Sequence, residues 1–136
     1  MIARWINRPR IEQVNIIKSG VNMGNKPQIK NDPLYLLLRD GEIEEFNKRK
    51  TAGESCDLTA CDFRNVDLRG IDASGLDFSD GYFHQTDLRG VDLRQANMEG
   101  ASLNGARISG TYFPPQLTAE EIGLSLVHGI RMRYQK

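Results

Sequence analysis

The chain has 136 residues, 26% of them charged, and its basic and acidic side chains cancel to a formal net charge of zero. This composition is typical of one small domain with extensions, and no stretch approaches the roughly 20 apolar residues that a membrane span needs. The first residues, MIARWINRPR, are not followed by the apolar core of a secretory signal. We therefore expect a cytoplasmic protein without a membrane-spanning segment.

Residues 1–31 are predicted to be a basic N-terminal arm. Six Lys and Arg residues against the single acid Glu12 give this segment a net charge of +5. Such a cluster can bind nucleic acid, but Trp5 is its only aromatic residue and no known reader motif is present, so we do not expect nucleic acid to be the partner. The periodicity leaves open whether the arm is flexible, an extra strand or an amphipathic helix. The candidate nucleic-acid contacts are Arg4, Arg8, Arg10 and Lys18.

Residues 32–55 are predicted to be a helical N-terminal cap. Asp32 can cap a helix that begins at Pro33 and runs through PLYLLLRD until Gly41 breaks it. A second short helix is expected over EIEEFNKRK. The apolar residues expected to cover the segment that follows are Leu34, Leu37, Leu38, Ile43 and Phe46.

Residues 56–115 repeat every five residues without interruption. The twelve blocks read CDLTA CDFRN VDLRG IDASG LDFSD GYFHQ TDLRG VDLRQ ANMEG ASLNG ARISG TYFPP. The third place of each block is large and apolar in every block but one, where it is Ala73, and the first place is small or aliphatic. A fixed period sustained over this length is typical of a repeat architecture.

A five-residue period fits neither a helix nor a single strand. On a helix, which turns about 100° per residue, the third-place residues would drift around the axis, and on one strand they would alternate between faces. The chain must therefore turn once per block, and the Gly at the end of many blocks suits a repeated corner. Four turns close a coil of twenty residues, so that twelve blocks form three stacked coils whose open ends need caps.

These blocks resemble the pentapeptide-repeat family, whose usual block is Ala-Asp/Asn-Leu-x-x. The resemblance covers residues 56–115 and implies a right-handed quadrilateral β-helix. The expected fold is thus a mainly β solenoid of about three coils with α-helical caps at both ends, in a bacterial protein. Some members of this family mimic duplex DNA and bind type II topoisomerases such as gyrase. Here the repeats carry nine acids against five Arg, a net charge of −4, which is low for a DNA mimic of this length.

Residues 116–136 are predicted to be a C-terminal capping helix. Thr118 and Glu121 fit a capping box after the two prolines that end the repeats. One apolar stripe is expected to close the last coil over Leu103, Ile108 and Phe113, and it consists of Ala119, Ile122, Leu126 and Ile130. A second row, formed by Leu124, His128 and Met132, is a candidate for self-association, which would make the protein a homodimer through its cap helices.

The outward-facing aspartates recur at twenty-residue spacing and should stack into ladders of like charge. Arginines placed two residues after an Asp can offset this repulsion. The two DLRG blocks, with Arg107 in the same column as their aspartates, are the candidate partner face. The residues concerned are Asp67, Arg69, Asp87, Arg89 and Arg107. The sequence leaves open whether they recognise a partner or only neutralise the ladder.

No combination of residues typical of catalysis is present, and we expect no enzyme activity, no cofactor and no metal. Cys56 and Cys61 occupy inward first places, where buried thiols are expected, and the chain lacks further ligands for a zinc site. The predicted function is a non-enzymatic protein-binding or scaffold module with a protein partner. Two alternatives remain: a DNA-mimic regulator of gyrase, and nucleic-acid binding through the arm.

Overall fold

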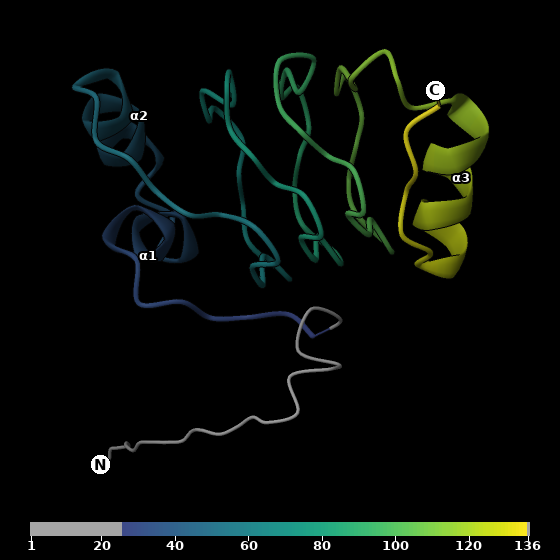
Figure 1. Ribbon diagram of the computed structural model, residues 1–136, viewed down its shortest axis with the longest axis horizontal. Coiled ribbons are helices and arrows are strands. Elements are labelled where there is room, and N and C mark those ends of the chain that lie inside the picture. The colour runs from purple at the N-terminus through teal and green to yellow at the C-terminus, as the bar shows by residue number, and fades with distance from the viewer. Residues whose placement is uncertain (1–25, 136) are drawn as a thin grey trace.

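The computed structural model describes residues 26–135, which contain three helices. Helix α1 covers Pro33–Arg39, α2 covers Ile43–Thr51 and α3 covers Ala119–His128. Figure 1 shows α1 and α2 at one end, a series of stacked coils in the middle, and α3 at the other end with the C-terminal segment running back beside it. We call residues 56–115 the coil stack, residues 26–55 the N-terminal lid and residues 116–135 the C-terminal lid.

The coils of the stack are joined by backbone hydrogen bonds between residues about twenty positions apart. Parallel bridges pair Asp67 with Asp87 and Asp87 with Arg107, and equivalent bridges occur on the other sides of the stack. In most repeats of the first two coils the third-place N–H donates to a carbonyl of the next coil, as Leu88 N does to Arg107 O at 2.9 Å. The corners fall at the block ends, where Gly70 and Gly90 adopt positive φ angles of 86° and 74°.

The prediction of a mainly β fold was wrong. Within residues 26–135 the regular elements are the three helices, and the repeats form isolated bridges without any extended strand or sheet. The reason lies in the period itself, because a corner follows each bridging residue before a second consecutive pair can form. The backbone groups between coils are paired, but each extended run is too short to count as a strand.

The core of the coil stack is the column of third-place side chains. Ten of these twelve residues, from Leu58 to Leu103, are buried, whereas Ile108 and Phe113 in the last coil are only half-buried. Near the middle, Phe63 and Phe83 stack with ring centroids 5.0 Å apart, and Phe78 meets both rings edge-on.

Gly81 is required by this aromatic cluster. A Cβ atom at position 81 would lie 2.7 Å from Cε2 of Phe83 and 3.0 Å from the carbonyl oxygen of Phe78. The first place of this block therefore has no side chain, because the Phe83 ring occupies the space that a first-place side chain fills elsewhere.

The N-terminal lid supplies acceptors for the exposed N–H groups of the first coil. The N–H of Asp57 donates to a carboxylate oxygen of Asp32 at 3.0 Å, and that of Asp62 donates to the carbonyl of Gln28 at 2.8 Å. On another side of the stack, the N–H of Asp72 donates to the side-chain carbonyl of Asn47 at 2.9 Å. These contacts satisfy backbone groups that would otherwise lack partners at an open end.

The predicted helices of this lid are confirmed. Asp32 caps α1 through its side chain, and Pro33 is the first helical residue. The expected lid residues Leu34, Leu38 and Phe46 are buried, while Leu37 and Ile43 are half-buried against the same core.

Tyr35 is a buried member of this lid that the sequence did not single out. Its hydroxyl donates to the carbonyl of Asp62 at 2.7 Å, and burial raises the pKa of Tyr35 to about 12. The ring meets Phe63 edge-on, with centroids 5.4 Å apart, so Tyr35 connects the lid to the aromatic core.

The C-terminal lid supplies acceptors to the last coil in the same way. The N–H groups of Met98, Gly100, Leu103 and Gly105 donate to four acceptors in this lid. In that order the acceptors are the Tyr134 hydroxyl at 2.8 Å, the Met132 carbonyl at 2.7 Å, the Ser125 hydroxyl at 2.8 Å and the Leu126 carbonyl at 3.1 Å.

The prediction of a helix along most of residues 116–136 was wrong in its extent. Helix α3 ends at His128 because Gly129 adopts the left-handed conformation with φ of 72°, and the chain then returns along the last coil. Thr118 caps the helix as predicted, accepting from the N–H of Glu121, but the Glu121 carboxylate accepts from the N–H of Arg133 at 2.8 Å.

The predicted helical row of Leu124, His128 and Met132 does not form. Leu124 and His128 are exposed on α3, but Met132 lies beyond the helix and is fully buried against the coil stack. Self-association through Leu124 and His128 stays a prediction. In the part of the chain that the structure describes, no helix has the length and apolar character required to span a bilayer.

Replacing Phe83 by Ala should lower the free energy of unfolding by about 3–5 kcal/mol, because it leaves a cavity beside the packed rings of Phe63 and Phe78. Chemical denaturation followed by circular dichroism measures the change. Leu124→Ala, at an exposed position of α3, is the control and should cost far less. Equal losses in the two variants would contradict the buried position of Phe83.

Replacing Ser125 by Ala should cost about 1–3 kcal/mol, because the buried N–H of Leu103 loses its acceptor and the Ile130 carbonyl loses its donor. The same denaturation experiment tests this. Ser109→Ala, at an exposed serine of the last coil, is the matched control. A Ser125 variant as stable as the control would show that the C-terminal lid does not depend on this hydroxyl.

Candidate partner-binding face

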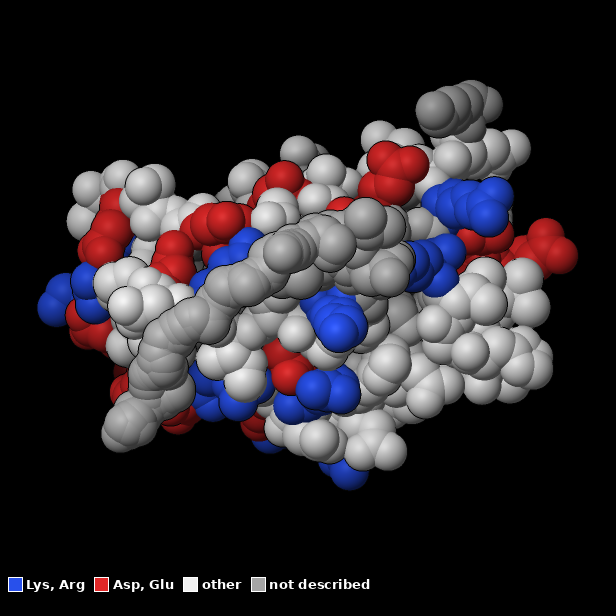
Figure 2. Space-filling model, turned by 60° about the horizontal axis from the view of Figure 1, so that its bottom comes forward, with Lys and Arg blue, Asp and Glu red and all other residues white. Residues whose placement is uncertain are grey.

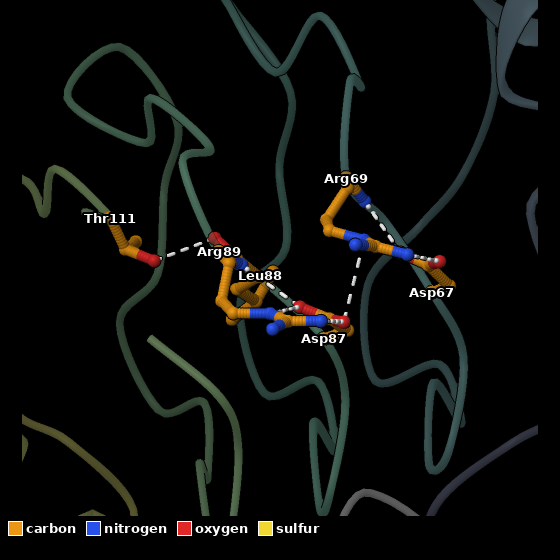
Figure 3. Close-up of polar contacts among 6 residues, drawn as sticks. All are labelled: Asp67, Arg69, Asp87, Leu88, Arg89 and Thr111. Atoms are coloured by element: carbon orange, nitrogen blue, oxygen red, sulfur yellow. Dashed lines mark hydrogen bonds and ion pairs between the residues drawn. The ribbon is translucent and has the colours of Figure 1, made fainter. Parts of the chain in front are cut away.

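The candidate site is the side of the coil stack formed by residues 66–70, 86–90 and 106–110, which we call the DLRG face. Second- and fourth-place side chains point outward here because the first and third places face the core. The corner after each third place brings the Asp and the Arg of one block together on this surface. Figure 3 shows the resulting arrangement for the two DLRG blocks.

Each DLRG block folds its arginine onto its own aspartate. In the first block, the carboxylate of Asp67 accepts from Nε of Arg69 at 3.0 Å and from Nη2 at 2.8 Å. In the second, Asp87 accepts from Nε and Nη2 of Arg89 at 2.9 and 2.7 Å. Both carboxylates also accept from the backbone N–H of their arginine, so each pair is held in one planar, two-bond geometry.

The two pairs are also connected between coils. Nε of Arg69 lies 3.4 Å from Oδ2 of Asp87, so that Asp67, Arg69, Asp87 and Arg89 form a continuous chain of alternating charge (Figure 3). Hydrogen bonds from Arg89 lower the pKa of Asp87 to about 2, and Arg69 lowers the pKa of Asp67 below its usual range. Both aspartates are therefore ionised at neutral pH, and the predicted repulsion along the ladder is offset.

Arg107 differs from the other arginines of the repeats. Its backbone bridges to Asp87, which confirms its place in the aspartate column. Its side chain is exposed and forms no ion pair with any residue that the structure describes. The last coil thus adds an uncompensated positive charge to the end of a neutral ladder.

The other sides of the stack repeat the paired arrangement. Arg64 binds Asp62 and Arg94 binds Asp92 through the same two-bond contacts, and lysines of the N-terminal lid pair with two further aspartates. On the face drawn in Figure 2, acidic and basic side chains are interspersed.

Two threonines near this site, Thr86 and Thr111, were not singled out from the sequence. Both stand at first places. The Thr86 hydroxyl donates to the Phe63 carbonyl at 2.6 Å, and the Thr111 hydroxyl donates to the Leu88 carbonyl at 2.6 Å (Figure 3). The available signal was the polar Thr at a place where the repeat usually has a small apolar residue. These hydroxyls add side-chain hydrogen bonds to the backbone contacts between coils.

The remaining predicted positions lie elsewhere. Arg4, Arg8, Arg10 and Lys18 of the basic arm fall outside the described residues. Cys56 and Cys61 are free thiols, and burial raises the pKa of Cys61 to about 12, so this thiol stays protonated at neutral pH. Residues 26–135 contain no group of three or more His, Cys, Asp or Glu side chains placed to hold a metal ion.

The family model for pentapeptide repeats matches the chain in eight copies, over residues 56–95 and 82–113. These ranges coincide with the blocks whose carbonyl and N–H groups join the coils. Residues 56–113 belong to the pentapeptide-repeat family. This membership indicates a repeat protein with a scaffold or binding role. Searches of curated proteins and of solved structures found no match.

Asp87 should make the stability of this pentapeptide-repeat protein depend on acid. Its folded-state pKa of about 2 lies below the ordinary 3.8, so its contribution is complete above pH 3.8 and is lost as the pH falls through about 2. The stability gap between the wild type and Asp87→Asn should therefore shrink from pH 5 to pH 2, measured by urea denaturation. Asn97→Ala removes a neutral second-place side chain with the same backbone hydrogen bond, and its gap should stay constant. A constant gap for Asp87→Asn would contradict the ion-pair geometry.

Proposed function

We propose that this protein is a non-enzymatic protein-binding module, and that the DLRG face is its recognition surface. Arg107 carries the proposal. It is an exposed cation without an ion pair among the described residues, beside four side chains already held in fixed positions by one another. A carboxylate from a partner could bind Arg107 without displacing an internal acid.

The paired side chains make this surface favourable for binding. Arg69 and Arg89 are each anchored through two bonds to an aspartate, so a partner need not bear the whole entropic cost of ordering them. With two aspartates and three arginines, the DLRG face has a net charge of +1. This balance favours an acidic segment of a protein partner over a polyanion such as nucleic acid, whose binding requires several unpaired cations.

Capture from bacterial lysate, with and without nuclease, tests this function. We expect Arg107→Glu to reduce recovery of the partner about tenfold or more, because a favourable charge contact becomes a repulsive one. Arg133→Glu is the matched control, since it makes the same charge change at an exposed arginine of the C-terminal lid that also forms no ion pair with a described residue. The control should capture the partner as the wild type does.

Three other outcomes would contradict this proposal. Equal capture by both variants would remove the DLRG face from recognition. Capture that disappears with nuclease, or with deletion of residues 1–25, would favour nucleic-acid binding through the basic arm. Recovery of gyrase with undiminished binding by Arg107→Glu would favour DNA mimicry.

A further inference from the structure

The C-terminal lid covers only half of the last coil. It accepts from the third- and fifth-place N–H groups on two adjacent sides of the stack, those of residues 96–100 and 101–105. On the other two sides, the N–H groups of Ile108, Gly110 and Phe113 have no hydrogen-bond partner among the described residues. The carbonyls of Ala106 and Thr111 likewise accept no hydrogen bond there. We call residues 106–113 the open edge.

In the preceding coil, every group equivalent to those of the open edge is paired. The N–H of Leu88 donates to the Arg107 carbonyl at 2.9 Å, and the N–H of Gly90 donates to the Ser109 carbonyl at 2.9 Å. The N–H of Leu93 donates to the Tyr112 carbonyl at 2.7 Å. The carbonyls of Thr86 and Val91 accept from Arg107 N and Tyr112 N at 2.9 and 3.0 Å. The open edge therefore presents the same pattern of donors and acceptors, and no residue in 26–135 pairs with them. An unpaired edge of this kind is a template for another extended chain.

The apolar side chains of the open edge are also less covered than their equivalents in the preceding coil. Ile108 and Phe113 are half-buried, whereas their equivalents Leu88 and Leu93 are at most 1% exposed beneath the next coil. We use the word rung for an extended segment that stacks on a coil through parallel backbone hydrogen bonds. A further rung on the open edge would place a second-place side chain over Arg107, in the column that begins with Asp67 and Asp87. An acidic side chain at that position would pair with Arg107.

We propose that the open edge binds an extended segment of a partner protein, which runs parallel to residues 106–113 as one additional rung. The segment places an acidic side chain over Arg107 and large apolar side chains over Ile108 and Phe113. Its carbonyls accept from the three free N–H groups, and two of its N–H groups donate to Ala106 and Thr111. This inference rests on the proposed function and names the form in which the partner binds.

The opposite end of the stack already accepts a rung from outside the repeats. Gln28 forms a parallel bridge with Cys61, donating its N–H to Ala60 O at 3.0 Å and accepting from Asp62 N at 2.8 Å.

A second copy of this chain is a poorer occupant for the open edge. In a two-fold symmetric dimer, the open edges of the two copies would run antiparallel. Each edge would contribute three N–H donors and two carbonyl acceptors, so some N–H groups would remain without an acceptor.

Backbone amide NMR of the full chain can test this inference with a defined probe. The probe is a synthetic peptide with the sequence of residues 86–95, TDLRGVDLRQ, because that segment has the acidic and apolar places that an added rung needs. Titration to millimolar concentration should shift the amide signals of Ile108, Gly110 and Phe113 saturably. Those amides should also become protected from hydrogen exchange.

Two altered peptides serve as controls without changing the protein. N-methylation at the residues corresponding to Asp87 and Asp92 removes the two N–H groups that would donate to Ala106 and Thr111, and should abolish the shifts. A peptide carrying Lys in place of the residue corresponding to Asp87 should bind at least tenfold more weakly, because it would face Arg107.

The outcomes separate this inference from the proposed function. Equal binding of the N-methylated peptide, or no binding of the probe, would overturn rung addition. Concentration-dependent shifts of the open edge without peptide would overturn it in favour of a second copy. If the probe binds as expected while lysate capture is unaffected by Arg107→Glu, the binding of an extended segment at the open edge is supported. The proposal that the DLRG face recognises the partner is then rejected.

Discussion

The structure depends on backbone hydrogen bonds between residues about twenty positions apart. Each coil uses its third- and fifth-place N–H groups and its first-place carbonyls to hold the next coil, so no coil is satisfied alone. The same constraint determines what must happen at the ends. Asp32, Gln28 and Asn47 accept from the first coil, and Ser125 with the returning C-terminal segment accepts from the last. The lids are thus extensions of the hydrogen-bonding pattern as well as apolar covers.

The charged surface follows from the length of one block. An arginine two places after an aspartate lies across the same corner, so that a two-bond ion pair forms within the block with little dependence on the rest of the fold. Stacking then brings these pairs side by side, as Arg69 and Asp87 show at 3.4 Å. The exposed pair of Asp67 with Arg69 contributes little to stability by itself. The larger effect of these pairs is to neutralise and order a surface that would otherwise carry a ladder of like charge.

The two ends of the coil stack differ in a way that bears on function. Arg107 and the open edge both belong to the last coil, where the C-terminal lid covers two sides and the donors and acceptors of the other two have no partner within residues 26–135. An exposed cation and an unsatisfied backbone edge on one side of the molecule are complementary to an acidic, extended polypeptide. Both features exist because α3 ends at His128 and the chain turns back at Gly129 before reaching the remaining sides.

The sequence by itself determined the inward residues, the corners, the caps at Asp32 and Thr118, and the pairing of Asp with Arg inside a block. All of these depend on neighbours within a few residues, where spacing fixes geometry. It misjudged the β content, because a corner after each bridge prevents strands from forming. It also extended the last helix through Met132, which lies instead against the last coil. Only the tertiary structure decided which backbone groups of the last coil are covered and that Arg107 has no partner among the described residues. Those properties depend on where the segment that returns after α3 comes to lie against the last coil, and no local sequence pattern encodes that position.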